Sequence, residues 1–297
     1  MNLSISLNYT TLICFDLIFL SDLISNSEKT MKLMVLEEWS DSIHQKDGIN
    51  QDKERQMRYE AVSFMTSYGI FFKLPQITIA KGIHIFHQVS SQISFKKFDR
   101  LLYGAVCVFL ASKLDDYPKP IKEFTRAFDY MHTIHKKQMV KNVNNPYFEP
   151  SYNEISEEGY KAHKLEGKKQ ADVEDRFCNT EIEVLKWIGY DFKIELPYHY
   201  LDHVKNSPII PDADFLKIAN NFINDSMRTT ACLFYEPRVI ALAALNLASH
   251  FCSYKFPILE NQQPWYKCFG FDVEMEIVEE VTLHIMEIYK RFTFLQK

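Results

Sequence analysis

The amino-acid sequence predicts an all-α protein, and three observations support that fold class. From Gln51 onward, apolar residues recur at spacings of three and four, the period of one helix face. Proline stands where helices could begin, at Pro75, Pro118, Pro197 and Pro237. Only 8 of the 297 residues are glycine, where a soluble protein of this size averages roughly 20. Glycine-rich phosphate loops and the tight turns of doubly wound sheets are therefore not expected.

The helical pattern continues to the end of the chain, and no convincing alternating strand interrupts it. Helices are expected at residues 52–68, 76–91, 98–114, 119–136, 172–189, 197–205, 212–230, 237–252 and 273–292, with a short one near 262–268.

The length of the chain suits two small domains, which we expect at residues 51–195 and 196–297. We expect residues 1–50 to form an N-terminal extension with a peripheral helix. Its apolar run, Leu12–Leu20, follows no Lys or Arg, contains Asp16 and is shorter than the ~20 residues that span a bilayer. Neither a signal peptide nor a membrane span is expected there. The run either packs on the first domain, or the segment ahead of Met31 is dispensable.

The first domain contains a segment of different composition, at about residues 141–170. Asn, Pro, Tyr, Glu and Lys predominate there without a clear period, which predicts a surface insertion between the fourth and fifth helices.

A short internal repeat suggests that the two domains are alike. The triplet Leu-Ala-Ser occurs at 110–112 and again at 247–249, each time after a run of small and aliphatic residues. Such a run suits a helix around which others pack closely. We expect one central helix in each of two similar bundles.

Two charged residues fall on otherwise apolar helix faces. Lys113 lies four residues after Phe109, and Glu181 lies between Phe177 and Val184 on a second stripe. Isolated charges on buried faces lose hydration worth several kcal/mol unless they pair or meet a partner. Lys113 could also reach solvent at its helix end. The pair is nevertheless the strongest site signal in the chain.

Composition argues against several other functions. The net charge is −5, so the chain lacks the broad basic surface of proteins that coat DNA. The six cysteines stand apart, without a Cys-x-x-Cys pair, which suggests reduced and mostly buried thiols. No metal motif, cofactor site or catalytic assembly is apparent, although histidine pairs occur at helical spacing. These pairs are His84/His87, His132/His135 and His199/His203.

The sequence from about Trp39 to Arg291 resembles a cyclin of the transcription and RNA-processing branch. It looks closest to cyclin L, and cyclin K and cyclin T are similar. The resemblance rests on Leu74-Pro75-Gln76, Leu110-Ala111-Ser112-Lys113, Asn224-Asp225-Ser226-Met227-Arg228-Thr229 and Phe269-Gly270.

This resemblance implies two stacked five-helix cyclin boxes, with the surface insertion in the first. It also implies a nuclear, non-enzymatic regulatory subunit that binds and activates a cyclin-dependent serine/threonine kinase in RNA polymerase II transcription, pre-mRNA splicing or both. The kinase would dock through its C helix, and no membrane or direct nucleic-acid contact is expected. The positions that the family uses for kinase binding correspond to Lys113, Glu181, Leu114, Leu185, Tyr190 and Phe192.

Two alternatives share this fold. A protein of the general transcription factor IIB type grips promoter DNA with two cyclin boxes, but that role calls for basic faces and usually a zinc ribbon, whereas this chain is acidic overall. A cyclin-box scaffold that activates no kinase would present the same sequence features.

Overall fold

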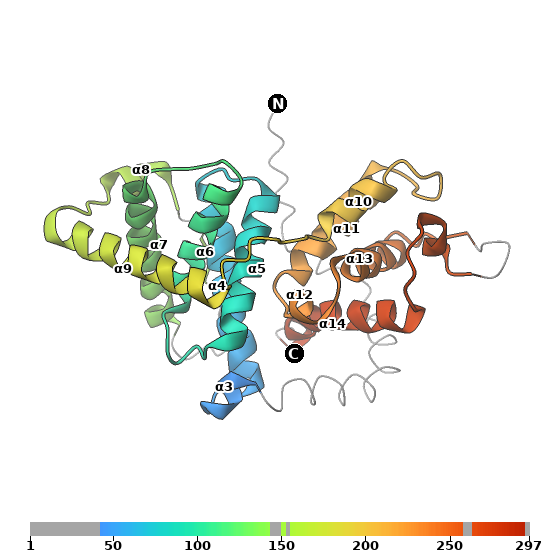
Figure 1. Ribbon diagram of the computed structural model, residues 1–297, viewed down its shortest axis with the longest axis horizontal. Helices are drawn as coiled ribbons and strands as arrows, with labels where there is room; N and C mark the ends of the chain where they lie inside the picture. The colour runs from blue at the N-terminus through green and yellow to red at the C-terminus, as the bar shows by residue number, and fades with distance from the viewer. Residues whose placement is uncertain (1–41, 143–149, 153–154, 258–262, 295–297) are drawn as a thin grey trace.

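The computed structural model describes residues 42–142, 150–152, 155–257 and 263–294. Every regular element in these ranges is a helix, which confirms the all-α fold class. The helices gather in two groups, one from each half of the chain, joined by the linker that precedes α10 (Figure 1). The expected N-terminal helix around Leu12–Leu20 lies outside the described residues.

The first group is arranged around α6 (Arg100–Leu114), which packs against four other helices. Its residues from Leu101 to Ser112 are all buried. Asp99 caps its N-terminus, because the Asp99 carboxylate accepts hydrogen bonds from the N–H groups of Leu101 and Leu102 at 3.1 and 3.3 Å. The surrounding helices are α4 (Gln51–Phe71), α5 (Gln76–Gln92), α7 (Ile121–Lys141) and α9 (Gly167–Trp187), with the short α3 (Ile43–Lys46) and α8 (Glu157–Ala162) at the periphery.

The second group is arranged in the same way around α13 (Pro237–Phe251). The Leu-Ala-Ser repeat therefore marks equivalent central helices, as expected. Even the local bonds match, because the Ser112 hydroxyl donates to the Phe109 carbonyl and the Ser249 hydroxyl to the Asn246 carbonyl, both at 2.7 Å. The other elements are α10 (Tyr198–Val204), α11 (Ala213–Ser226), α12 (Ala231–Phe234), η1 (Trp265–Phe269) and α14 (Met275–Phe294). The 3-10 helix η1 lies where a short helix was expected, near residues 262–268.

The helix expected over residues 212–230 ends earlier, at Ser226. Thr229 explains the end, because its hydroxyl donates to the Ser226 carbonyl at 2.7 Å and accepts from the Ala231 N–H at 3.1 Å. Such side-chain bonds compete with the helical ladder. The Met227 carbonyl is thereby left available for a contact with the first group of helices.

The described part of the insertion, residues 150–152 and 155–170, is more ordered than its composition suggests. It contains α8, which is capped by Ser156 accepting from the Gly159 N–H at 3.0 Å, and α9 begins at Gly167 rather than at residue 172. The Ser-Glu-Glu start of α8 is a helix signal that a search for longer periods misses. Tyr160 fixes the insertion to the first group, since its ring lies 5.0 Å from the Phe71 ring.

Five helices end in the same reversal of the chain, and three of these ends lack glycine. After α4, α6 and α13, the left-handed position is held by Lys73, Asp116 and Ser253, with φ of 56°, 61° and 51°. After α3 and α9 it is held by Gly48 and Gly189, with φ of 77° and 61°. This position usually carries glycine, since other residues are strained there. The low glycine content therefore has a conformational cost at three helix ends.

We expect Ser253→Gly to raise the free energy of unfolding by about 0.5–1 kcal/mol. The substitution relieves the left-handed strain, and the greater flexibility of glycine in the unfolded chain offsets part of the gain. Urea unfolding measures the change. The reverse substitution, Gly189→Ala, should destabilise by a similar amount, because an added Cβ meets no atom within 4 Å and only the backbone strain acts.

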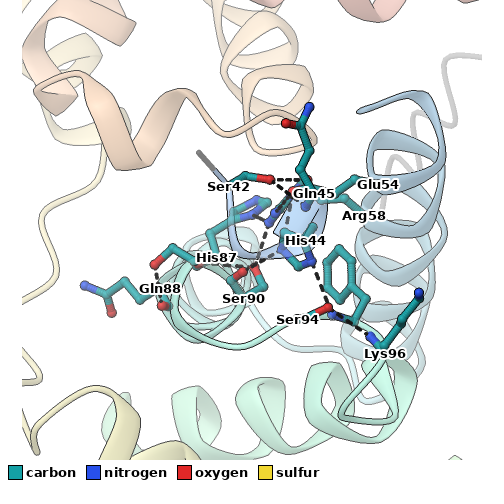
Figure 2. A network of polar contacts seen from close by, with 12 residues as sticks. Ser42, His44, Gln45, Glu54, Arg58, His87, Gln88, Ser90, Ser94 and Lys96 are labelled. Atoms are coloured by element: carbon teal, nitrogen blue, oxygen red, sulfur yellow. Dashed lines mark hydrogen bonds and ion pairs between the residues drawn. The ribbon is translucent and has the colours of Figure 1, made fainter. Parts of the chain in front are cut away.

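A buried polar network joins α3, α4 and α5 (Figure 2) and reaches the second group of helices through Met227. Arg58 is 3% exposed and pairs with Glu54 at 2.8 Å. Its other amino group contacts Ser90 Oγ at 2.7 Å and His87 Nδ1 at 2.9 Å. His87 Nε2 donates to the freed Met227 carbonyl at 2.8 Å. One buried side chain thus links the two groups of helices.

The histidines of this network are neutral in the folded protein. Burial and the Arg58 charge lower the pKa of His44 to about 4 and that of His87 to about 3. The hydrogen bonds agree with this, because His44 Nε2 donates to the Ser90 carbonyl at 2.8 Å while its Nδ1 accepts from the Phe95 N–H at 3.2 Å. A proton on either ring would displace one of these partners.

Stability should therefore fall as the pH is lowered from about 6.5 toward 4. In that window the unfolded chain binds protons on these histidines and the folded chain does not, so each neutral histidine removes up to about 1.4 kcal/mol per pH unit. Burial raises the pKa of Glu54, which offsets part of the loss near the acid end. Urea titrations across the window should show a shallower slope for His44→Gln. His199→Gln, at an exposed position, is the control.

The cysteines are not mostly buried, contrary to the expectation from the sequence. Among the described residues, Cys178, Cys252 and Cys268 are exposed and only Cys107 is fully buried. Within the described ranges, no group of three His, Cys, Asp or Glu side chains could hold a metal ion, and no helix is long and apolar enough to cross a membrane.

Candidate functional site

The structure brings Lys113 and Glu181 together. Lys113 lies in the last turn of α6, and its ammonium group pairs with a Glu181 carboxylate oxygen on α9. The same ammonium group lies 4.5 Å from the centre of the Phe109 ring, a cation–π contact that covers its inner side. The Lys113 side chain is 39% exposed and that of Glu181 is 16% exposed. The pair therefore lies at the surface end of the two apolar stripes rather than in the core.

Leu114 and Leu185 are two apolar residues close to this pair in sequence. Leu114 directly follows Lys113, and Leu185 lies one helical turn beyond Glu181 on the same face of α9. Both side chains are partly buried and pack against the core. They form a firm apolar base beside the charges.

Tyr190 and Phe192 lie just beyond α9, and both are exposed, at 58% and 39%. The chain reverses at Gly189, where the Tyr190 N–H donates to the Leu185 carbonyl at 3.1 Å. In this Schellman-type end Gly189 holds the left-handed position, and Tyr190 also has a positive φ, of 57°. A bulky residue held in that conformation without a buried contact favours a role at the surface.

Three further exposed apolar residues, Tyr117, Ile182 and Trp187, belong to the same elements and were not predicted as part of the site. Ile182 follows Glu181 on α9 and is 49% exposed. Tyr117 is 47% exposed and stands at the end of α6, where its N–H donates to the Ser112 carbonyl at 2.8 Å. Its place is equivalent to that of Tyr190 on α9. The signal in the sequence is the aromatic residue that follows each helix end by three positions.

These residues define one kind of surface: a fixed pair of opposite charges bordered by apolar side chains at the ends of two packed helices. Exposed apolar side chains gathered in this way are typical of protein interaction sites. The ammonium group carries two further donor positions, and the carboxylate has further lone pairs, so both can bind backbone groups of a partner. This combination of paired charges and exposed apolar side chains suits the binding of a protein segment.

A tandem cyclin-box protein is the class that this fold and surface define. Residues 29–144 match the family model described as cyclin, N-terminal domain, and residues 205–288 match that described as Cyclin-T2-like, C-terminal domain. The chain belongs to the cyclin family, with relatives in its transcriptional branch.

Individual relatives come from three subtypes. The chain is 30% identical over 255 residues to Cyclin-T1-3 of Oryza sativa subsp. japonica, covering 84% of this chain and 46% of the relative. It is 26% identical over 244 residues to Cyclin-L1-1 of Arabidopsis thaliana, covering 82% and 52%. It is 27% identical over 261 residues to human Cyclin-K, covering 83% and 39%. The chain thus spans about half the length of these relatives or less.

Among solved structures, the chain is similar to one in the crystal structure of the yeast RNA Pol II CTD kinase CTDK-1 complex. The TM-score is 0.61 at 15% sequence identity, over 83% of this chain and 69% of that chain. This similarity supports the fold.

Proposed function

We propose that this chain is a regulatory subunit that binds and activates a cyclin-dependent serine/threonine kinase. The observation that carries the proposal is the Lys113–Glu181 pair, bordered by exposed apolar residues at the ends of α6 and α9. The named relatives are cyclins T, L and K, and the similar structure is that of a CTD kinase complex. They favour action in the nucleus, in RNA polymerase II transcription, pre-mRNA splicing or both.

In this proposal the kinase-binding surface consists of Lys113 and Glu181 with Leu114, Leu185, Tyr190 and Phe192, to which Tyr117 and Ile182 are added. The first cyclin box, residues 51–195, carries this surface, and residues 196–297 form the second box. All catalytic residues belong to the kinase, and the chain itself needs no cofactor.

The mechanism is a shift in the conformational equilibrium of the kinase. A protein kinase holds ATP correctly only when a lysine of its sheet pairs with the glutamate of its C helix. A surface that binds the C helix only in its inward position stabilises this state by its differential affinity for the two positions. Moving the inactive-to-active ratio from 99:1 to 1:99 takes about 5.5 kcal/mol of differential binding. Buried apolar contacts around one desolvated charge pair are of the right size to supply it.

Purification of the tagged chain from its native cell tests this function. A protein kinase should co-purify, be identified by mass spectrometry and phosphorylate a substrate only in the presence of the chain. Recovery of promoter DNA and polymerase without a kinase would favour the transcription factor IIB type of function. A kinase that binds but gains no activity would indicate a scaffold.

A further inference from the structure

Two carboxylates of α9 contact opposite ends of α6. Glu181 pairs with Lys113 in the last turn of α6, and Glu183 accepts a hydrogen bond from the hydroxyl group of Tyr103 in the first turn. Tyr103 is only 6% exposed, and its ring packs on the Phe98 ring with 4.5 Å between centroids. Glu183 itself is exposed. A buried side chain of α6 thus holds a second carboxylate next to the one that pairs with Lys113.

The spacing of these contacts shows how α9 lies on α6. Tyr103 and Lys113 are ten residues apart, which is about 15 Å along the axis of α6. Glu181 and Glu183 are only two residues apart, which places them about 200° apart around the axis of α9. The helix α9 therefore crosses α6, and its two carboxylates extend to opposite sides of the crossing.

The crossing itself is apolar. The Phe177 ring of α9 meets the Phe109 ring of α6 edge-on, with 5.5 Å between centroids. Val184, two turns further along α9, is fully buried. Apolar contacts have little directional preference, whereas hydrogen bonds weaken steeply when their geometry changes. The two carboxylate contacts therefore fix the rotation of α9 about its own axis, because a rotation that favours one contact pulls the other apart.

Other polar contacts of α9 constrain this rotation less. Arg176 pairs with Asp99 at 3.7 Å, but the two side chains are 57% and 36% exposed, and such pairs contribute little. At the end of α9, Gln92 Nε2 donates to the Trp187 carbonyl at 3.0 Å. Backbone atoms lie only about 2.3 Å from a helix axis, so this bond responds less to rotation than a side-chain contact farther from the axis.

We propose that Tyr103 is a positioning residue for kinase binding: by holding Glu183, it fixes the rotation of α9 and thereby the place of the Glu181 carboxylate beneath the docked C helix of the kinase. This inference rests on the proposed function. Groups that are held in their bound arrangement before binding lose less conformational freedom when the partner docks, which raises affinity.

The test measures the affinity of the co-purified kinase for variants of the full chain. Tyr103→Phe keeps the ring and removes only the hydroxyl group, and it should weaken kinase binding at least about fivefold. In a chain that already carries Glu181→Ala, the same substitution should change affinity less than about twofold, because the group that Tyr103 positions is gone. A merely structural role of Tyr103 would give the same loss in both chains.

Glu183 gives a second comparison. Glu183→Gln keeps an oxygen that can accept from the Tyr103 hydroxyl group and should hold affinity within about twofold. Glu183→Ala should weaken binding about as much as Tyr103→Phe and should add nothing to it in the double variant. Tyr235→Phe is the matched control, since the Tyr235 hydroxyl group donates to the Glu280 carboxylate in the second cyclin box. It should leave kinase binding unchanged.

Equal losses for Tyr103→Phe with and without Glu181→Ala would overturn the inference. So would wild-type affinity of Tyr103→Phe when Lys113→Ala lowers it. If neither Lys113→Ala nor Glu181→Ala lowers affinity, the proposed kinase site is wrong, and the inference is wrong with it. If Tyr103→Phe does not unfold cooperatively in urea, Glu183→Ala, at an exposed position, is judged by the same criteria.

Discussion

Arg58→Met is expected to lower the free energy of unfolding by about 3–5 kcal/mol, the usual effect of breaking a buried ion pair by removing one partner. Arg58 is 3% exposed and Glu54 is 1% exposed, so the remaining carboxylate has no access to water. Ser90 and His87 also lose the hydrogen bonds that they accept from Arg58. Urea unfolding, followed by circular dichroism, measures the loss.

Two comparisons separate the buried charge from general damage to α4. Adding Glu54→Gln to Arg58→Met should recover at least about 1 kcal/mol, because the unpaired charge is then removed. Lys205→Ala, which breaks an ion pair with Asp202 whose side chains are 50% and 67% exposed, should cost less than about 1 kcal/mol. A loss for Arg58→Met no greater than that for Lys205→Ala would contradict the role assigned to the network.

Lys113→Ala or Glu181→Ala is expected to weaken kinase binding by roughly 2–5 kcal/mol, a drop of at least about 30-fold in affinity. The reason is that the pair is partly exposed in the free chain but would be desolvated beneath a docked helix. Each substitution then leaves one charge buried without a partner in the complex. Titration of the co-purified kinase with each variant, with activity measured in parallel, gives both binding and activation.

The same substitutions should change the stability of the free chain by less than about 1 kcal/mol, since surface ion pairs contribute little. Kinase binding and stability are thus expected to respond very differently, which a purely structural role would not produce. Lys217→Ala, which removes an exposed ion pair with Asp214 on α11, is the matched control and should alter neither quantity. Unchanged co-purification and activation in both Lys113→Ala and Glu181→Ala would exclude this surface as the kinase site.

Much of the candidate site could be predicted because it is encoded in helical spacing. Lys113 comes four residues after Phe109, and Glu181 falls between Phe177 and Val184, so each charge had to lie on an apolar face wherever the helices packed. That the two faces would meet needed the fold, since α6 and α9 are separated by α7, α8 and the insertion. The family resemblance supplied that information before the geometry did.

The extent of the exposed surface could not be predicted in the same way. Ile182 carries an ordinary apolar side chain, and nothing in its spacing distinguishes it from core residues. Tyr117 is marked only by its place three positions after the end of α6. Their exposure depends on the neighbouring elements that leave them uncovered. The contacts of residues 150–152 with α4 and α7 escaped prediction for a related reason, since a short segment without periodicity shows its contacts only when the helices beneath it are in place.

The sequence by itself determined the helices, most of their ends and the apolar stripes, because these depend on hydrogen bonds and side-chain neighbours within about four residues. Only the tertiary structure decided that His87 would donate to the carbonyl of Met227, 140 residues away, and that Gln138 would hold the backbone of Ser151. Such contacts join segments with no common local pattern. They form because buried polar groups must find partners once apolar packing has excluded water.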